Sequence, residues 1–273
     1  MTIKMIAIDI DGTLNNDNHH ITPAVKKAIQ TAVQQGIKIV LCTGRPMPGV
    51  WPYLQDLNLQ GRDDQYVISF NGGLAQTTNG QIEAHYTIDF DDYLDWELFA
   101  RQANVHAHME TAEDIYTANQ DISRYSIVET YLANMRLHYR SMDQINAMRN
   151  HITICKLMML GDKEELDRVY QQIPARIQEK FHILRSEDFY IEYINKAASK
   201  GNALRNLGQR LGIQQNEIMA LGNGGNDLSM IKYAGLGVAM GNSIPQVLDL
   251  ADVVTADNNH DGVAAAINKY VLK

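Results

Sequence analysis

The stretch Ile6–Leu14, IAIDIDGTL, decides the fold. It overlaps a nearly continuous apolar run, Ile3–Ile10, that is rich in isoleucine. Such a run is typical of a strand that is buried on both faces, as strands of parallel sheets are. Gly12 comes next, and a glycine allows the chain to turn sharply where a strand ends. The sequence therefore predicts a buried strand with polar residues at its carboxyl end.

The segments on either side of this strand predict an α/β core. Thr22-Pro23 has the pattern of a helix N-cap followed by proline at the first helical position. The apolar spacing continues to Gly36, and a second buried strand follows at 37–42. This strand–helix–strand unit predicts a right-handed crossover. We expect further strands at 66–70, 217–221, 238–240 and 253–254, and helices near 203–211, 228–234 and 262–272.

The middle of the chain has a different pattern, with most of the aromatic residues and mixed helix and strand signals. His106, His108 and Glu110 alternate with apolar residues, as on a half-buried strand. We therefore expect an α/β fold with a Rossmann-like parallel core in three layers. Residues 1–85 and 189–273 would form this core, and residues 86–188 an inserted α+β domain.

Composition narrows the class of protein. The 273 residues are 45% hydrophobic and 21% charged, as in ordinary globular proteins. The net charge of -8 argues against a nucleic-acid or anionic-membrane surface. The two cysteines imply no disulfide framework, and no apolar run has the length of a signal peptide or membrane span. We expect a cytoplasmic protein whose partners are small molecules, as a monomer or a homodimer.

The first candidate site is the pair Asp9 and Asp11 after the predicted strand. Ligand sites of open α/β sheets lie beyond the carboxyl ends of the strands. Spacing of two residues predicts that both carboxylates can enter one pocket. One could then serve as a nucleophile and metal ligand, and the other as a general acid and base. The alternative is a strand-end turn with two solvated aspartates.

Two phosphate-binding candidates follow. Thr43 offers a hydroxyl after the second strand, and Gly44 lets a backbone N–H approach an anion closely. A plain strand–helix connection is the alternative. Lys200 opens a predicted helix, where the dipole disfavours a cation unless lysine and helix share a phosphate. A surface lysine is the alternative, and Lys196 is a nearby rival.

The fourth candidate is the loop at residues 222–227, GNGGND, directly after a predicted strand. Polar groups among glycines at a strand end suit a metal or phosphate loop, although a glycine-rich turn is the alternative. All four candidates follow strands or start a helix, so they can converge at one edge of a sheet. A metal site at His106, His108 and Glu110 is disfavoured, because nothing nearby completes a ligand set.

Together these stretches resemble the haloacid-dehalogenase superfamily of phosphatases, and more narrowly its Cof-type sugar-phosphatase subfamily. The matching stretches are IAIDIDGTL, VLCTGRP, NKAASKGNAL and LGNGGNDLSMI. The resemblance covers the whole chain, including NGG at 71–73, YTANQDIS at 116–123 and the ending DGVAAAINKYVLK. It implies Mg²⁺-dependent hydrolysis of sugar phosphates or similar small phosphate monoesters. The middle segment would be a cap that closes over the pocket and selects the leaving group.

The resemblance also implies residue roles. Asp9 would attack phosphorus to form an aspartyl-phosphate, and Asp11 would protonate the leaving alkoxide and later activate water. Thr43 and Lys200 would hold the phosphoryl oxygens, and Asn226 would contact phosphate or substrate. The Mg²⁺ site would use Asp9, the Asp11 carbonyl, Asn223 and Asp227, of which Asp227 would support either Lys200 or the metal shell.

One position departs from the subfamily. Asn223 stands where the subfamily usually has an aspartate that ligates Mg²⁺, so we expect weaker Mg²⁺ binding, with Asp227 compensating. The change also suggests an alternative function, a phosphometabolite-binding protein of low turnover. A phosphotransferase using the same aspartyl-phosphate is a further alternative. Asn223 and Gly224 are besides a deamidation-prone pair.

Overall fold

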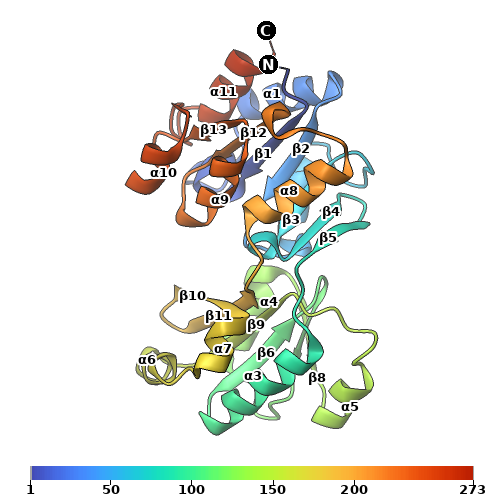
Figure 1. Ribbon diagram of the computed structural model, residues 1–273, viewed down its shortest axis with the longest axis vertical. Helices are drawn as coiled ribbons and strands as arrows, with labels where there is room; N and C mark the ends of the chain where they lie inside the picture. Colours follow the sequence, from blue (N-terminus) through green and yellow to red (C-terminus); the bar gives the residue numbers. More distant parts are fainter. Residues whose placement is uncertain (1, 273) are drawn as a thin grey trace. The chain divides into compact units, whose positions relative to one another are not determined.

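A computed structural model describes residues 2–272, apart from the side chain of Ser186. By its internal contacts the chain forms two compact units, each with its own sheet (Figure 1). The first consists of Met1–Arg45, Val50–His85 and Ser199–Lys273, and the second of Pro46–Gly49 and Tyr86–Ala198. Among the described residues, every helix is too short or too polar to cross a membrane.

The first unit contains an eight-stranded sheet in the order β14-β13-β12-β1-β2-β3-β4-β5. The pairs from β14 to β3 are parallel, and β4 and β5 add an antiparallel hairpin at one edge. The sequence did not predict this hairpin, and the sheet is mixed as a result. Its strands are β1 (Met5–Asp9), β2 (Lys38–Cys42), β3 (Tyr66–Ser69), β4 (Leu74–Thr77), β5 (Ile82–His85), β12 (Ile218–Gly222), β13 (Leu236–Ala239) and β14 (Val253–Val254).

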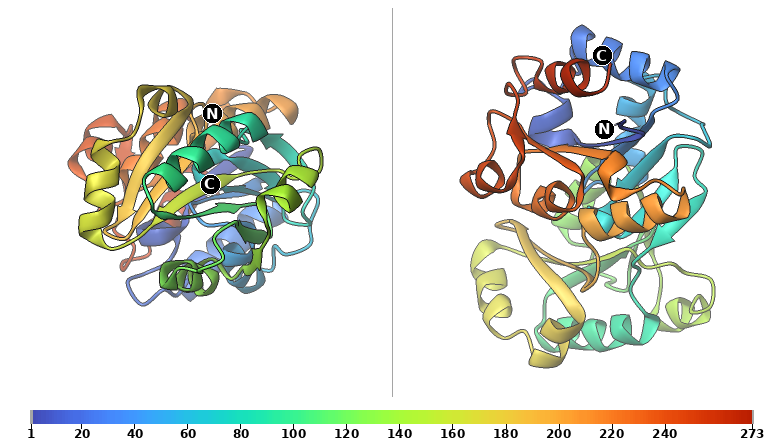
Figure 2. Two further views of the ribbon diagram at one scale, coloured as in Figure 1. Left: turned by 90° about the horizontal axis from the view of Figure 1, so that it is seen from below. Right: turned by 45° about the horizontal axis from the view of Figure 1, so that its top comes forward.

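Helices cover both faces of this sheet (Figure 2). On one face α8 packs with α9, and on the other α1 packs with α11. The predicted N-cap is present, since the Thr22 hydroxyl accepts a hydrogen bond from the Val25 N–H at 3.3 Å. The expected three-layer α/β core is thus confirmed. Its helices are α1 (Pro23–Gln34), α2 (Met47–Asp56), α8 (Lys200–Arg210), α9 (Leu228–Tyr233), α10 (Pro245–Leu250) and α11 (Gly262–Tyr270).

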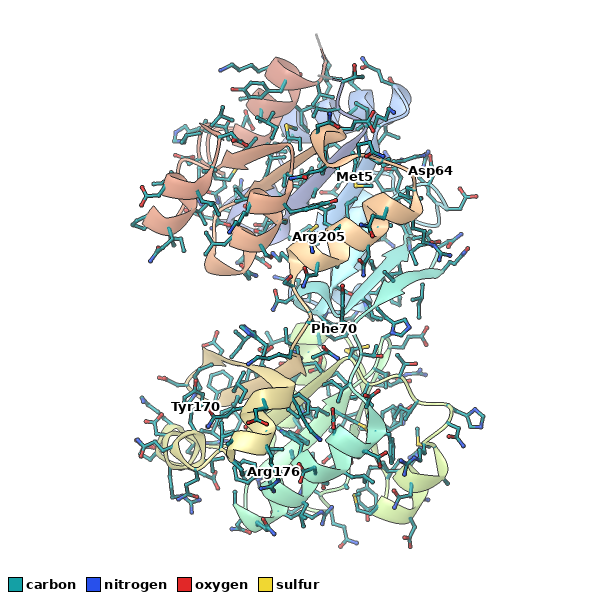
Figure 3. All side chains as sticks on the ribbon, viewed as in Figure 1. Met5, Asp64, Phe70, Tyr170, Arg176 and Arg205 are labelled. Atoms are coloured by element: carbon teal, nitrogen blue, oxygen red, sulfur yellow. The ribbon has the colours of Figure 1, made fainter. Side chains whose placement is uncertain are left out.

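Strand alternation in β1 determines where Asp9 points. Met5 and Ala7 belong to the apolar cluster that also holds Leu204 and Leu207 of α8, and Met5 lies inside the unit (Figure 3). Side chains two residues apart share a face of a strand. Asp9 therefore lies on the α8 face, at the carboxyl end of β1.

The second unit has a six-stranded sheet in the order β10-β11-β9-β6-β7-β8, antiparallel except for the β7–β8 pair. Its strands are β6 (His106–Glu110), β7 (Asp114–Thr117), β8 (Arg136–Tyr139), β9 (Lys156–Leu160), β10 (Phe181–Glu187) and β11 (Tyr190–Asn195). Its helices are α3 (Phe90–Gln102), α4 (Arg124–Ala133), α5 (Met142–Ala147), α6 (Lys163–Gln171) and α7 (Ala175–Lys180). Strand β11 belongs to this second sheet, although it lies beyond residue 188, where the sequence placed the boundary between the two units. An apolar run alone does not show which sheet a strand joins.

The polar face of β6 is buried. The strand alternates as predicted, but His108 and Glu110 are almost inaccessible to solvent, so the expectation of a half-buried strand is wrong. Buried Lys156 compensates, with its Nζ 3.3 Å from Glu110, 3.7 Å from Glu129 and 3.6 Å from Glu192. Burial lowers the pKa of His108 to about 3 and raises that of Glu110. Within residues 2–272 no cluster of three or more His, Cys, Asp or Glu could hold a metal.

Replacing Lys156 with methionine should destabilise the second unit by about 3–5 kcal/mol, because the buried carboxylates of Glu110 and Glu129 would lose their cation. The loss should grow as pH rises, since the glutamates must then ionise without a partner. Urea unfolding of a Trp51→Phe background would measure it, because buried Trp96 of α3 would be the remaining tryptophan. Exposed Lys163→Met is the matched control, and an equal loss there would contradict the prediction.

Candidate active site

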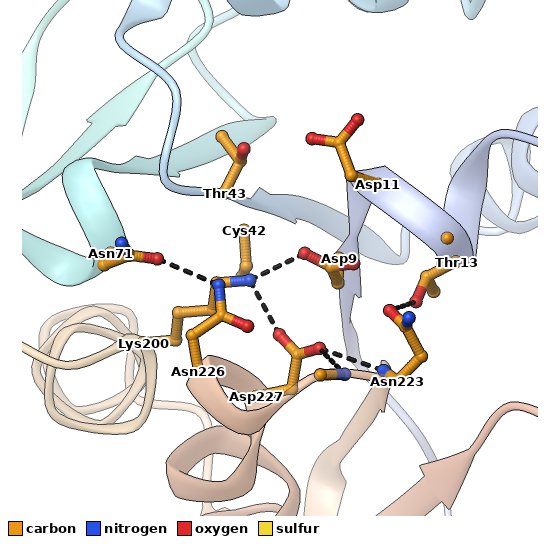
Figure 4. A network of polar contacts seen from close by, with 12 residues as sticks. Asp9, Asp11, Thr13, Cys42, Thr43, Asn71, Lys200, Asn223, Asn226 and Asp227 are labelled. Carbon is orange, nitrogen blue, oxygen red and sulfur yellow. Dashed lines mark hydrogen bonds and ion pairs between the residues drawn. The ribbon is translucent and has the colours of Figure 1, made fainter. Parts of the chain in front are cut away.

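The sheet order brings the sequence candidates together. Strands β12, β1 and β2 are neighbours, and in register Ile8 pairs with Leu221 and Asp9 with Cys42. Their carboxyl ends therefore lie side by side, and each is followed by one of the predicted loops. The first turn of α8 supplies the remaining candidate, Lys200 (Figure 4).

Lys200 is the centre of the site. Its side chain is fully buried, and its Nζ lies 2.6 Å from Asp9 Oδ1 and 2.7 Å from Asp227 Oδ1. The two carboxylates hold the ammonium charged, and the pKa of Lys200 is raised well above its usual range despite burial. The rival Lys196 is not at this site, since its Nζ donates to the Gln178 carbonyl in the second unit at 3.1 Å.

Asp227 anchors the loop after β12. Its Oδ1 accepts from Lys200, and its Oδ2 accepts from the backbone N–H groups of Asn223 and Gly224, both at 2.9 Å. Both oxygens are thus engaged by protein donors. The expectation that Asp227 compensates as a metal ligand does not fit this geometry. Of the two roles that the resemblance allowed, support of Lys200 is the one the contacts favour.

Asp11 does not share the surroundings of Asp9. The chain turns at Gly12, where φ is +77°, and the Asp11 carboxylate forms a bidentate pair with Arg45 at 2.9 Å for both bonds. Partial burial alone would raise the pKa of Asp11, but hydrogen bonds and charge from Arg45 hold it below its usual range. Arg45 belongs to the stretch VLCTGRP, but the sequence analysis assigned it no role. Its position directly after Thr43 and Gly44 was the available signal for this contact.

The phosphate-binding candidates lie around a small asparagine pair. Thr43 is buried, and its Oγ1 accepts from the Arg45 N–H at 3.1 Å. A side chain on Gly44 would meet Asn71, because its Cβ would lie 3.1 Å from Asn71 Nδ2. Asn226 Nδ2 donates to Asn71 Oδ1 at 3.0 Å. The sequence reasoning assigned no role to Asn71, although an Asn-Gly-Gly stretch after a strand was a usable signal.

The amide of Asn223 lies against oxygen atoms of the β1 loop. One of its two terminal amide atoms, nitrogen or oxygen according to the orientation of the amide, lies 3.0 Å from Thr13 Oγ1, 3.1 Å from the Asp11 carbonyl oxygen and 3.2 Å from Asp9 Oδ2. Mg²⁺ holds oxygens at about 2.0–2.1 Å in an octahedron, so neighbouring ligand atoms lie about 2.9 Å apart. With the amide oxygen at this position, Asn223, Asp9 and the Asp11 carbonyl have the spacing and chemistry of a Mg²⁺ site.

The environment of Asp9 has a consequence for stability. Burial, countered in part by Lys200, raises the pKa of Asp9 to about 7 from the ordinary 3.8. A carboxyl whose folded pKa is raised favours the folded state at low pH. That contribution is lost as pH rises through about 7.

We therefore expect the melting temperature of metal-free protein to fall between pH 5 and pH 8. Asp9→Asn should remove most of this dependence. Thermal unfolding in matched buffers measures both. Equal pH dependence in the two proteins would contradict the assignment of the effect to Asp9.

Known proteins are similar to this chain in sequence and fold. The proposed phosphatase YxeH of Bacillus subtilis is 43% identical over 98% of both chains. A haloacid dehalogenase-like hydrolase from Bacteroides thetaiotaomicron superposes with a TM-score of 0.84 at 30% identity, over 98% of this chain and 99% of that one. A sugar phosphatase of subclass IIB in the same superfamily gives a TM-score of 0.73 at 25% identity, over 98% of each.

The family of haloacid dehalogenase-like hydrolases matches residues 6–267, from β1 to the last helix. This range contains Asp9, Thr43, Lys200 and Asp227, so the match includes all four segments that form the site. The chain belongs to the haloacid dehalogenase-like hydrolase family.

Proposed function

We propose that this chain is a Mg²⁺-dependent phosphatase that hydrolyses sugar phosphates or similar small phosphate monoesters through an aspartyl-phosphate on Asp9. The arrangement of the Asp9 carboxylate carries the proposal. One oxygen is bound to buried Lys200, and the other lies in the set of oxygens that fits Mg²⁺. A carboxylate with a cation at each oxygen can approach an anionic phosphate ester, which an isolated carboxylate would repel.

In the first step an Asp9 oxygen attacks phosphorus, and the bond from phosphorus to the substrate's alkoxide oxygen breaks. Lys200 neutralises charge on the transferring group from within the protein, where its effect is strong. The Thr43 hydroxyl, the Gly44 N–H and the Asn226 amide hold the phosphoryl oxygens. Bound Mg²⁺ would add charge neutralisation at the phosphoryl oxygens.

Asp11 handles the protons. It gives a proton to the departing alkoxide, and it takes one from the water that later cleaves the aspartyl-phosphate to inorganic phosphate. In the structure Asp11 is held by Arg45, so it must leave the guanidinium before it can act as an acid. The phosphate of an arriving substrate is a suitable competitor for Arg45, because arginine binds phosphate in the same bidentate manner as carboxylate.

The substrate class rests on the relatives. The subclass IIB structure is that of a sugar phosphatase, which supports small phosphorylated sugars as substrates for this chain. The candidate residues that would handle phosphate all lie in the first unit. We assign selection of the leaving group to the second unit, residues 86–198.

Release of inorganic phosphate from a panel of sugar phosphates, in Mg²⁺ and then in EDTA, tests the proposal. Unaltered protein should release phosphate only with Mg²⁺, and Asp9→Ala should release none because it lacks the nucleophile. Asp11→Asn should slow turnover by about 10²–10⁴-fold, the usual contribution of general acid–base catalysis. Circular dichroism of each variant controls for folding.

The second candidate is a phosphometabolite-binding protein of low turnover, favoured by the neutral Asn223 at the cation site. It predicts a rise in melting temperature with sugar phosphates but no phosphate release at any Mg²⁺ concentration. That result would reject the phosphatase. Phosphate appearing on an added sugar instead of in solution would indicate a phosphotransferase.

A further inference from the structure

We infer that the Asn223 amide acts as a built-in substitute for the divalent cation, so that the cation site of this chain is closed by its own hydrogen bonds until Mg²⁺ displaces them. The inference deepens the proposed function and rests on it for the identity of the cation. Three features of the described residues carry it: the orientation of the amide, the charge of the site, and the space around the amide.

The orientation of the amide follows from its neighbours. With NH₂ facing the β1 loop, Asn223 donates to the Asp9 carboxylate, the Asp11 carbonyl and the Thr13 hydroxyl. With the oxygen facing the loop, only the Thr13 hydroxyl can donate to it, at 3.0 Å, and two acceptors face another acceptor. An amide takes the orientation that satisfies its neighbours. Without a cation, NH₂ therefore faces Asp9 and the Asp11 carbonyl.

The two orientations suit two different states of the site. A cation at this place needs oxygen from Asn223, since an NH₂ group has no lone pair available for a metal. Binding must therefore turn the amide over, which breaks three hydrogen bonds and forms one metal–oxygen bond. This exchange weakens cation affinity relative to a site that is open beforehand.

The charge of the site acts in the same direction. Lys200 lies between Asp9 and Asp227 and offsets one of their two negative charges, and Asn223 adds none, so one net negative charge is left to attract Mg²⁺. An aspartate at 223 would double that charge. In the metal-free protein, however, it would lie about as close to Asp9 Oδ2 as the amide does, at 3.2 Å, with no donor between them.

Gly12 provides the space that both orientations need. A Cβ on Gly12 would lie 2.7 Å from the Asn223 amide, and its φ of +77° disfavours any other residue. A side chain at position 12 would therefore collide with the Asn223 amide, which glycine leaves in place next to the β1 loop.

The experiment is calorimetric titration of Mg²⁺ into metal-free protein without substrate, for unaltered protein, Asn223→Asp and Asn226→Asp. Asn223→Asp should bind Mg²⁺ at least about tenfold more tightly. Asn226→Asp adds the same charge three residues along the same loop, but leaves the Asn223 amide intact, so it should gain less. A peptide map should first show that residue 223 of the unaltered protein is still asparagine.

Melting temperatures test whether the Asn223 amide stabilises the metal-free site, or whether residue 223 affects only the affinity for Mg²⁺. In EDTA at pH 8, Asn223→Asp and Asn223→Ala should both melt below the unaltered protein, because each loses the three donated hydrogen bonds. In saturating Mg²⁺, Asn223→Asp should recover and Asn223→Ala should not.

Two outcomes would overturn the inference. One is Mg²⁺ affinity of Asn223→Asp no tighter than that of unaltered protein, and the other is an Asn223→Ala variant as stable as unaltered protein in EDTA. Neither measurement uses a phosphate ester, so they can fail while phosphate release succeeds, or succeed while phosphate release fails. Asn223→Ala keeps the test valid should the aspartate variant not fold.

Discussion

The contact of buried Lys200 with Asp9 and Asp227 is the interaction on which the first unit's carboxyl edge depends. A buried ammonium is costly unless carboxylates surround it, so the chain can bury Lys200 only where β1 and the loop after β12 meet. Two glycines permit the approach of α8. A Cβ on Gly72 would lie 2.2 Å from the Ser199 carbonyl oxygen, and one on Gly201 would lie 2.3 Å from that of Ser229. The close packing that Gly72 and Gly201 allow thus positions the ammonium of Lys200.

Two aspartates separated by one residue acquire opposite properties from their neighbours. Asp9 is buried, and its pKa is raised, whereas Asp11 is half-exposed beside Arg45, and its pKa is lowered. Divergent surroundings of paired carboxyls are a common mark of acid–base sites. In our proposal the order reverses during turnover, because Lys200 and a bound cation would keep Asp9 ionised, while release from Arg45 would let Asp11 carry a proton. In this proposal the protonation states needed for catalysis would arise only when the cation and the substrate phosphate are bound.

Sequence alone could predict the parallel strands and the loops that follow them, because short isoleucine-rich runs such as Ile3–Ile10, ended by glycine-containing loops, are typical of buried strands. It could also single out Lys200, whose place at a helix start conflicts with the dipole. It could not assign β11 to the second sheet, nor predict the burial of Glu110, because both depend on partners distant in sequence. The pairing of Arg45 with Asp11 was missed for the same reason. The hydrogen bonds from the Asn223 and Gly224 N–H groups to Asp227 are local, but the sequence does not show which atoms of Asp227 they engage. Short motifs indicate which residues lie close together, but not which of their atoms already form hydrogen bonds or ion pairs within the protein.

The position of β1 at the centre of the sheet affects the order in which the chain can be assembled during synthesis. Its neighbour β12 begins at Ile218, and Asp9 meets Lys200 across 191 residues of chain. Residues 86–198 are continuous and can fold as soon as they leave the ribosome. The first unit cannot be completed until its last segment, Ser199–Lys273, has been synthesised. An interrupted chain would therefore carry Asp9, the nucleophile of our proposal, without Lys200 and the loop after β12. Such a chain would lack the candidate active site, as a consequence of the strand order alone.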